Sequence, residues 1–175
     1  MTALTLRQGR LREAARFLFL ALLGSAVLAA SARIALPLWP VPATLQSLAV
    51  LLLAALGGTR LGLASVVLYL AEGALGLPVF AGGATGLTAF AGPTAGFLLG
   101  FLPAALIAGQ AGRGGWLRDG GILLAAHLAL FVPGVLWLSG FVGAEKALVA
   151  GFLVFLPGTA VKTGLALAAV SLRRR

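Results

Sequence analysis

Six apolar stretches divide this chain, and their lengths constrain its fold more than any other feature. They cover about residues 15–35, 42–57, 60–76, 94–111, 119–140 and 156–172. Of the residues in the chain, 61% are hydrophobic and only 10% are charged, whereas soluble domains average about 45–50% apolar and about 25% charged residues. A membrane-spanning helix needs about 20 apolar residues. The sequence therefore predicts an all-α integral membrane protein, with residues 1–175 forming one transmembrane domain of six helices. The second, third and sixth stretches predict short helices, or helices completed by loop structure at one end.

Lysine and arginine are distributed unevenly between these stretches. Six helices put both termini on one side of the membrane, and ten of the 13 basic residues fall on that side: Arg7, Arg10, Arg12, Arg16, Arg60, Arg113, Arg118, Arg173, Arg174 and Arg175. Only Arg33, Lys146 and Lys162 fall on the other side. By the positive-inside rule, we expect the arginine-rich side and both termini to be cytoplasmic in a multi-pass protein of the cell (inner or plasma) membrane. The formal charge of +9 then indicates topology and attraction to anionic membrane lipid. It does not indicate nucleic-acid binding, because the arginines are split among helix ends.

The first apolar stretch allows two interpretations. A basic residue, an apolar run and the small residues Ala30-Ser31-Ala32 are typical of a secretory signal, whose cleavage would leave five helices. In the other interpretation, the stretch is not cleaved and forms the first transmembrane helix. Small residues recur in it at four-residue spacing, and such ladders allow a partner helix to approach closely. The predicted partner interface consists of Ala21, Ser25, Ala26, Ala29 and Ala30.

Catalytic and metal-binding residues are scarce in the sequence. The chain has no cysteine and a single histidine, His127, in the middle of the fifth stretch. A histidine without nearby carboxylates favours a packed or hydrogen-bonded role between helices over metal ligation. The four acidic residues of the chain form no pair at helical spacing, and no hydrolase or nucleotide-binding motif occurs in the sequence. We therefore expect no enzyme, metal site or cofactor. Glu72, near the outer end of the third helix, is the one candidate functional carboxylate within the membrane.

Polar and irregular features converge on the side opposite the arginines. The segment Leu36–Pro42, which includes Trp39 and three prolines, predicts a stiff, extended loop. It precedes the second helix, whose first turn is expected to contain Thr44 and Gln46. A Gly- and Thr-rich loop over residues 77–93 follows the third helix and must lie at the surface or over a protein-lined cavity, because irregular backbone does not face lipid. The predicted ligand-binding residues are Trp39, Thr44, Gln46, Tyr69, Glu72, Phe80, Gly82, Gly83, Thr159 and Lys162.

Lys162 is the most informative of these residues. Thr159 is a natural N-cap for the sixth helix, and a stabilising capping box would have Glu at the third position after it, where this chain has Lys162. A cation in the first turn opposes the helix dipole by about 0.3–1 kcal/mol. With the free N–H groups of the helix, however, Lys162 would form an anion site at membrane depth. The alternative is a lysine that extends its amine to lipid headgroups. An anion site predicts a small ligand with one carboxylate and a largely apolar body.

Several of these segments resemble the BioY family. The resemblance lies in residues 40–47 (PVPATLQS), 76–83 (GLPVFAGG), 92–101 (GPTAGFLLGF), 134–138 (GVLWL) and 155–158 (FLPG) with Lys162. BioY is the biotin-specific substrate-capture (S) component of energy-coupling-factor (ECF) vitamin transporters. The resemblance implies a six-helix S-component fold that binds biotin from outside. It also implies a transmembrane coupling protein and paired ATPase subunits as partners, although some members of the family are thought to work without them. It implies uptake by alternating access, with lids from the loops after the first and third helices.

One position departs from the family pattern. Where the family typically has Pro-Gly-Asp-x-x-Lys, with the acid and the lysine both contacting biotin, this chain has Thr159 in place of the acid. A hydroxyl is a weaker acceptor than a carboxylate. Three explanations stay open: lower affinity, replacement by another group such as Glu72, or a different ligand. The alternatives to biotin uptake are accordingly an S component for another small carboxylate vitamin and, in another class, a membrane scaffold that does not transport.

Overall fold

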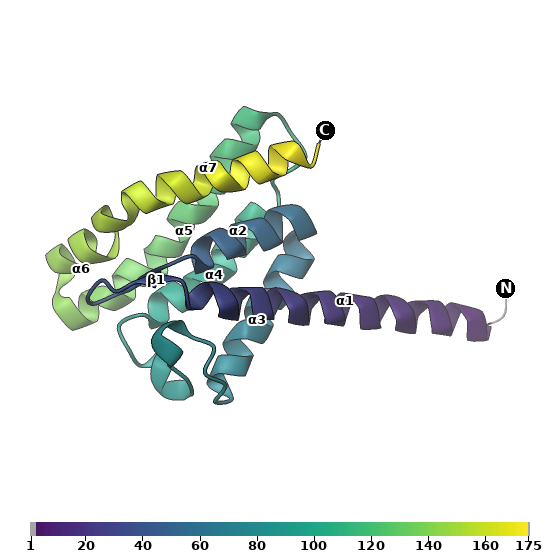
Figure 1. Ribbon diagram of the computed structural model, residues 1–175, viewed down its shortest axis with the longest axis horizontal. Helices are drawn as coiled ribbons and strands as arrows, with labels where there is room; N and C mark the ends of the chain where they lie inside the picture. The colour runs from purple at the N-terminus through teal and green to yellow at the C-terminus, as the bar shows by residue number, and fades with distance from the viewer. Residues whose placement is uncertain (1–2, 175) are drawn as a thin grey trace.

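We describe the chain from a computed structural model, which defines the backbone of residues 3–174 and the side chains of residues 8–174. Helices account for most of it (Figure 1). In chain order the elements are α1 (Ala3–Ala32), β1 (Ala35–Leu36), β2 (Ala43–Thr44), α2 (Gln46–Gly57), α3 (Thr59–Ala74), the 3-10 turns η1 (Ala81–Gly83) and η2 (Leu87–Phe90), α4 (Ala95–Ala108), α5 (Trp116–Val142), α6 (Ala144–Gly151), the 3-10 turn η3 (Leu153–Phe155) and α7 (Leu156–Leu172). Arg175 and the side chain of Arg7, both used above for the topology, lie outside the described residues.

Each apolar stretch of the sequence contains a helix, and one further helix was not expected. α1 begins at Ala3 rather than near residue 15, and α5 is longer than its apolar stretch. The segment around Glu145 and Lys146, expected to be an outer loop, forms the short helix α6. Gly143 separates α5 from α6 with a φ of 84°, a left-handed conformation that favours glycine and ends helices. The sixth apolar stretch is therefore α7, and α6 is an addition at its N-terminal side.

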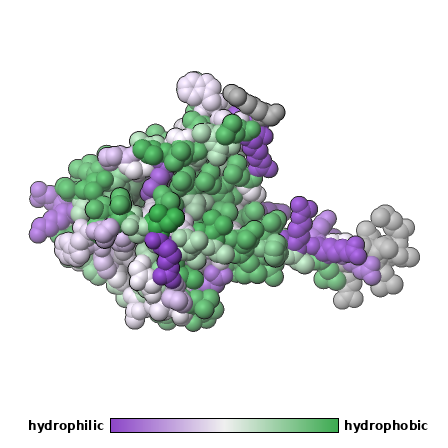
Figure 2. Space-filling model, viewed as in Figure 1, coloured by the Kyte–Doolittle hydropathy of each residue, from purple (hydrophilic) through white to green (hydrophobic). Residues whose placement is uncertain are grey.

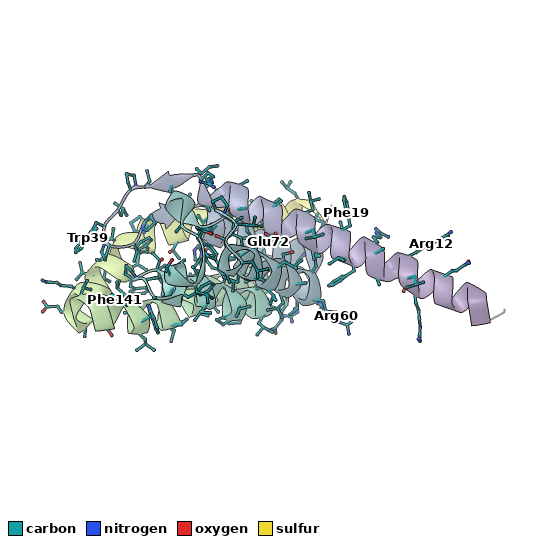
Figure 3. The ribbon with its side chains drawn as sticks, turned by 90° about the horizontal axis from the view of Figure 1, so that it is seen from below. Arg12, Phe19, Trp39, Arg60, Glu72 and Phe141 are labelled. Carbon is teal, nitrogen blue, oxygen red and sulfur yellow. The ribbon has the colours of Figure 1, made fainter. Side chains whose placement is uncertain are left out.

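The bundle has two ends of different character. Both described termini lie at one end, where Figure 3 also places Arg12 and Arg60; we call it the arginine end. Trp39 and Phe141 lie at the opposite end, which we call the loop end. Hydrophobic residues cover most of the visible body between them (Figure 2). Residues 8–32, 116–142 and 144–172 are long and apolar enough to cross a membrane, and α2 and α4 are shorter apolar helices. The chain is thus a multi-pass membrane protein.

A small hairpin and the segment 77–93 complete the bundle at the loop end. The segment Leu36–Pro42, expected to be an extended loop, connects two short strands in which Ala35 pairs with Thr44 and Leu36 with Ala43. α2 has only 12 residues, about 18 Å at the helical rise, so it is shorter than the roughly 30 Å hydrocarbon core. The hairpin continues the chain beyond this helix at the loop end. α3 and α7, with 16 and 17 residues, are also short, as the sequence predicts.

Glycine residues bring α4 and α5 into close contact. A Cβ atom added at Gly96 would lie 2.3 Å from the carbonyl oxygen of Pro133, and one added at Gly100 would lie 2.4 Å from that of Leu130. Gly134 likewise leaves room for the ring of Phe97. Small residues at helix contacts allow backbones to pack directly, which is the main source of helix association in membranes. This contact fixes the two helices that form one wall of the cavity described below.

The small-residue ladder of α1 packs mainly inside the chain. Ala21 and Ser25 are 1% exposed, and Ser25 Oγ donates a 2.5 Å hydrogen bond to Glu72 Oε2 on α3. The expected partner interface is therefore wrong for these two residues, because α3 of the same chain already covers them. Ala29 is half-buried, whereas Ala26 and Ala30 are exposed. For the exposed pair, contact with another protein stays a prediction. The preceding part of α1, residues 8–20, is exposed and projects beyond the body (Figure 1).

Candidate functional site

A cavity of about 170 Å³ lies within the bundle, bounded by α2, α4, α5, α7 and the two loop-end segments. Its walls are largely aromatic, formed by Phe80, Phe97, Phe101, Phe131 and Phe155. Its polar lining consists of Thr44, Gln46, Ser47, Thr94, His127, Thr159 and Lys162. An apolar chamber with a few convergent polar groups is typical of a small-molecule site. The volume is below the roughly 300–1,000 Å³ common for such sites, so a ligand of that size requires the loop-end segments to move apart.

Lys162 supplies the positive charge of the cavity. It lies in the second turn of α7, because that helix begins at Leu156 with Phe155 as its N-cap residue. The prediction that Thr159 caps the helix and that Lys162 lies in its first turn is therefore wrong; Pro157, favoured in the first turn, starts the helix earlier. Lys162 Nζ donates hydrogen bonds to the backbone oxygen of Thr44 at 2.7 Å and to Ser47 Oγ at 3.2 Å. Its positive charge, rather than the helix dipole, makes this part of the cavity suited to an anion.

Gln46 is held in place by residues on either side. Its Nε2 donates to Tyr69 Oη at 2.5 Å, and its Oε1 accepts from Thr44 Oγ1 at 3.0 Å. Tyr69 Oη in turn donates to the backbone oxygen of Val79 at 3.3 Å. Tyr69 itself is fully buried and lies behind the cavity lining. These bonds fix the orientation of the Gln46 amide at the cavity and connect α2, α3 and the segment 77–93.

Phe80 anchors the segment 77–93 over the cavity. It is 2% exposed, and its ring makes edge-to-face contacts with Tyr69 and Phe90, at centroid distances of 5.3 and 5.6 Å. A Cβ atom added at Gly73 of α3 would lie 2.0 Å from this ring. The absence of a side chain at Gly73 thus allows Phe80 to pack against α3. Because edge-to-face aromatic pairs add about 0.5–1.5 kcal/mol beyond their burial, this contact stabilises the segment in its closed position.

His127 connects two helices and also lines the cavity. Its Nδ1 lies 3.0 Å from Thr163 Oγ1 on α7, and its ring stacks on Phe131 at an interplanar angle of 7°. The predicted hydrogen-bonded role between helices is confirmed. No group of three or more His, Cys, Asp or Glu residues able to hold a metal ion occurs among the described residues.

Five of the ten residues predicted to bind ligand do not line the cavity: Tyr69, which lies behind the lining, and the four described next. Trp39 is 86% exposed and lines a separate surface groove with Phe141. Gly82 and Gly83 form the turn η1, with φ values of 68° and 78°, while their neighbours Ala81 and Ala84 reach the lining. Glu72, near the middle of the view in Figure 3, accepts the bond from Ser25 on α1 described above. In this structure these residues position loops and helices rather than line the cavity.

Sequence reasoning did not identify Ser47, Thr94, His127 or most of the aromatic wall as cavity residues. One available signal was spacing: Phe97 and Phe101 on α4, like His127 and Phe131 on α5, are four residues apart and therefore share a helix face. In a chain that is apolar on every side of its helices, that spacing does not distinguish an internal face from a lipid-facing one. The packing of α4 against α5 determines which faces are internal.

The chain is similar to known proteins in both sequence and fold. The sequence model of the BioY family matches residues 3–175. The chain is 37% identical to the "Probable biotin transporter BioY" of Pyrococcus horikoshii, over 81% of this chain and 85% of that protein. It is 38% identical to the biotin transporter BioY2 of Lactococcus lactis, over 77% of this chain and 76% of that protein. Its fold matches the crystal structure of the S-component for biotin from an ECF-type ABC transporter with a TM-score of 0.83 and 25% identity, covering 100% of this chain and 95% of the other.

Proposed function

The chain belongs to the BioY family, and we propose that it captures biotin in the cavity between α2, α4, α5 and α7 and carries it into the cell. The observation that supports this most strongly is the cavity itself, in which one lysine and several amide and hydroxyl groups lie beside an aromatic wall. Biotin has the complementary parts: a carboxylate, an apolar chain and thioether ring, and a ureido group that both donates and accepts hydrogen bonds. Transport of this kind involves no chemical change to the ligand, so the chain acts without catalysis or cofactor.

We assign the biotin carboxylate to Lys162. An ammonium has three N–H donors, of which two are used by Thr44 and Ser47, and the third is available to a ligand. A charge-assisted hydrogen bond to a carboxylate is stronger than a bond between neutral groups. Gln46, Thr44 and Thr159 are the neutral groups that we assign to polar atoms of the ligand.

We further propose that biotin enters from the loop end, which faces outward, while the arginine end faces the cytoplasm. Most basic residues lie toward the arginine end, as the positive-inside rule requires. The hairpin and the segment 77–93 are then the lids. Residence in the plasma membrane, and coupling to a transmembrane protein with ATPase subunits, belong to the same proposal, supported by the likeness to an S-component of an ECF-type transporter.

Binding of radiolabelled biotin to the detergent-purified chain tests this function. We expect saturable binding that riboflavin and thiamine do not displace, and its loss in Lys162→Ala. Lys146→Ala is the matched control, because Lys146 is the other lysine of the chain and is exposed on α6, outside this cavity. Saturable binding of another radiolabelled vitamin that carries a carboxylate, with none of biotin, would favour the second candidate, an S component for a different carboxylate vitamin, which the threonine at position 159 supports. Binding of neither would contradict a capture function.

A further inference from the structure

A second cavity, of about 430 Å³, opens at the arginine end, far from the site assigned to biotin. It lies where the end of α2, the connection between α4 and α5 and the end of α7 meet. Three arginines line it, Arg113, Arg173 and Arg174, together with backbone of glycine residues. We name it the arginine cavity. Nothing in the capture of biotin uses these residues.

The charges of the arginine cavity are only partly neutralised within the chain. Arg174 forms an ion pair with Asp119, whose side chain is fully buried at the start of α5. Arg173 donates a hydrogen bond to the backbone oxygen of Leu56 near the end of α2, which leaves most of its five N–H donors available. Among the described residues, the pair between Arg174 and Asp119 is the only recorded ion pair. Three positive charges against one negative leave a net charge of +2, which favours an anionic occupant.

An apolar groove begins at the arginine cavity. It runs along α2, with walls from α1 and the start of α3, and it shares Leu56 and Gly57 with the arginine cavity. We name it the α2 groove; its lining includes Val27, Leu45, Leu48, Leu52, Leu56 and Leu61. From Leu45 to Leu56 the helix rises roughly 16 Å. Half of the roughly 30 Å hydrocarbon core is about 15 Å, so the groove has the depth of one membrane leaflet.

We propose that the arginine cavity and the α2 groove together bind an anionic phospholipid, with its phosphate at Arg113 and Arg173 and one acyl chain along α2. Arginine pairs with phosphate through parallel N–H bonds, and basic pockets at the cytoplasmic ends of transmembrane helices bind anionic headgroups. A soluble phosphate would satisfy the arginine cavity but leave the groove empty, whereas a helix of a partner protein would fill the groove and would need an acidic side chain at its end to match the charge. A lipid of this class supplies the negative charge and the apolar chain in one molecule, in the order in which the two features adjoin.

Native mass spectrometry of the detergent-purified chain tests the proposal with dioleoyl phosphatidylglycerol, dioleoyl phosphatidylcholine and glycerol 3-phosphate. We expect the chain to retain phosphatidylglycerol but not phosphatidylcholine. Millimolar glycerol 3-phosphate should not displace the bound phosphatidylglycerol. Arg113→Gln and Arg173→Gln should each weaken retention about 5-fold, and together about 30-fold, which corresponds to about 1 kcal/mol per arginine. Arg118→Gln is the matched control, because Arg118 is exposed at the same end but lines neither feature. Arg174 is kept, since its loss would leave Asp119 buried without a partner.

The groove has its own pair of variants. Val27→Trp should obstruct it and reduce phosphatidylglycerol retention, whereas Val67→Trp, at a position 53% exposed on α3 outside the groove, should not. Biotin binding by every variant reports that the fold is intact. Equal retention of the two lipids, full displacement by glycerol 3-phosphate, or unchanged retention in the arginine double variant would each overturn the proposal. The first of these results would mean that lipid binds without regard to the charge of its headgroup, and the second that the arginine cavity binds a soluble anion.

Discussion

Lys162 Nζ donates a 2.7 Å hydrogen bond to the backbone oxygen of Thr44, which joins the second turn of α7 to strand β2 of the loop-end hairpin. The same lysine that we assign to the ligand therefore also holds a lid segment. A carboxylate that takes the third N–H of the ammonium leaves this link intact, whereas one that displaces Thr44 releases the hairpin. We therefore expect ligand binding and hairpin position to be coupled through this one side chain.

Replacement of Thr159 by aspartate tests the departure from the family pattern. Thr159 is 3% exposed at the cavity, three residues before Lys162 and on the same side of α7. Hydrogen bonds to charged groups contribute about 1.5–3 kcal/mol and neutral ones about 0.5–1.5 kcal/mol. We therefore expect Thr159→Asp to tighten biotin binding about 5-fold, measured by isothermal titration calorimetry. The Thr159→Asn variant, whose side chain has the shape of aspartate without the charge, should bind biotin with an affinity near that of the wild type. Unchanged or weaker binding by the aspartate variant would mean that biotin does not present its N–H groups here.

Removal of the Tyr69 hydroxyl should weaken both the fold and the site. Gln46 is buried and donates to Tyr69 Oη at 2.5 Å, so Tyr69→Phe leaves its amide without that partner. A buried polar group left unsatisfied costs about 1–3 kcal/mol, and we expect a loss of that size in unfolding free energy, with weaker biotin binding because the amide is no longer oriented. Thermal unfolding and calorimetry measure the two effects. In Gln46→Leu, adding Tyr69→Phe should cost clearly less stability than it does in the wild type. Additive losses would show that the pair is not coupled.

The sequence predicted the helices well because their determinants are local. Pro157 and the apolar run that follows it define α7, and Gly57-Gly58 end α2. The hairpin was missed because its strands have only two residues each, too few to show an alternating pattern, and the pairing of Ala35 with Thr44 depends on how α1 and α2 are placed. Lys162 was found by its unusual position in an apolar segment, although the argument from the helix dipole was wrong. The aromatic wall was missed because phenylalanine faces lipid as readily as a cavity.

Contact between α4 and α5 should tolerate no side chain at Gly100. A Cβ atom there would lie 2.4 Å from the carbonyl oxygen of Leu130, so Gly100→Ala must separate the helices, and overpacking of this kind costs about 1–3 kcal/mol. We expect a lower unfolding temperature and reduced biotin binding, because these helices form one wall of the cavity. Gly121→Ala on α5 is the control: nothing lies within 4 Å of its added Cβ, and alanine in a helix is favoured over glycine by about 0.5–1 kcal/mol. Equal stability of the two variants would contradict the close contact.

The rate of lid opening should depend on Arg33. Arg33, directly after α1, donates a hydrogen bond to the backbone oxygen of Pro78 at the start of the segment 77–93. It therefore links the connection between α1 and the hairpin to the second lid, across the loop end. Because the cavity is small, we expect biotin to enter and leave only when these segments separate. Arg33→Gln shortens the side chain and removes the charge, so the charged hydrogen bond, worth roughly 1 kcal/mol after solvent screening, is lost. We therefore expect association and dissociation of biotin to accelerate together by about 3- to 10-fold. The equilibrium affinity should change less than either rate.

Stopped-flow measurement of tryptophan fluorescence, with Trp39 on the hairpin as a reporter, gives both rates. Arg118→Gln is the matched control, since Arg118 is an exposed cation at the start of α5, at the arginine end and so at the opposite end of the bundle from both lids. Faster rates in Arg33→Gln alone would identify its bond to Pro78 as the barrier to opening. Unchanged rates would place that barrier in the packing of Phe80 against Tyr69 and Phe90, and Phe80→Leu should then accelerate exchange instead. In that case the rim of aromatic contacts, and not the arginine at the surface, controls access to the cavity.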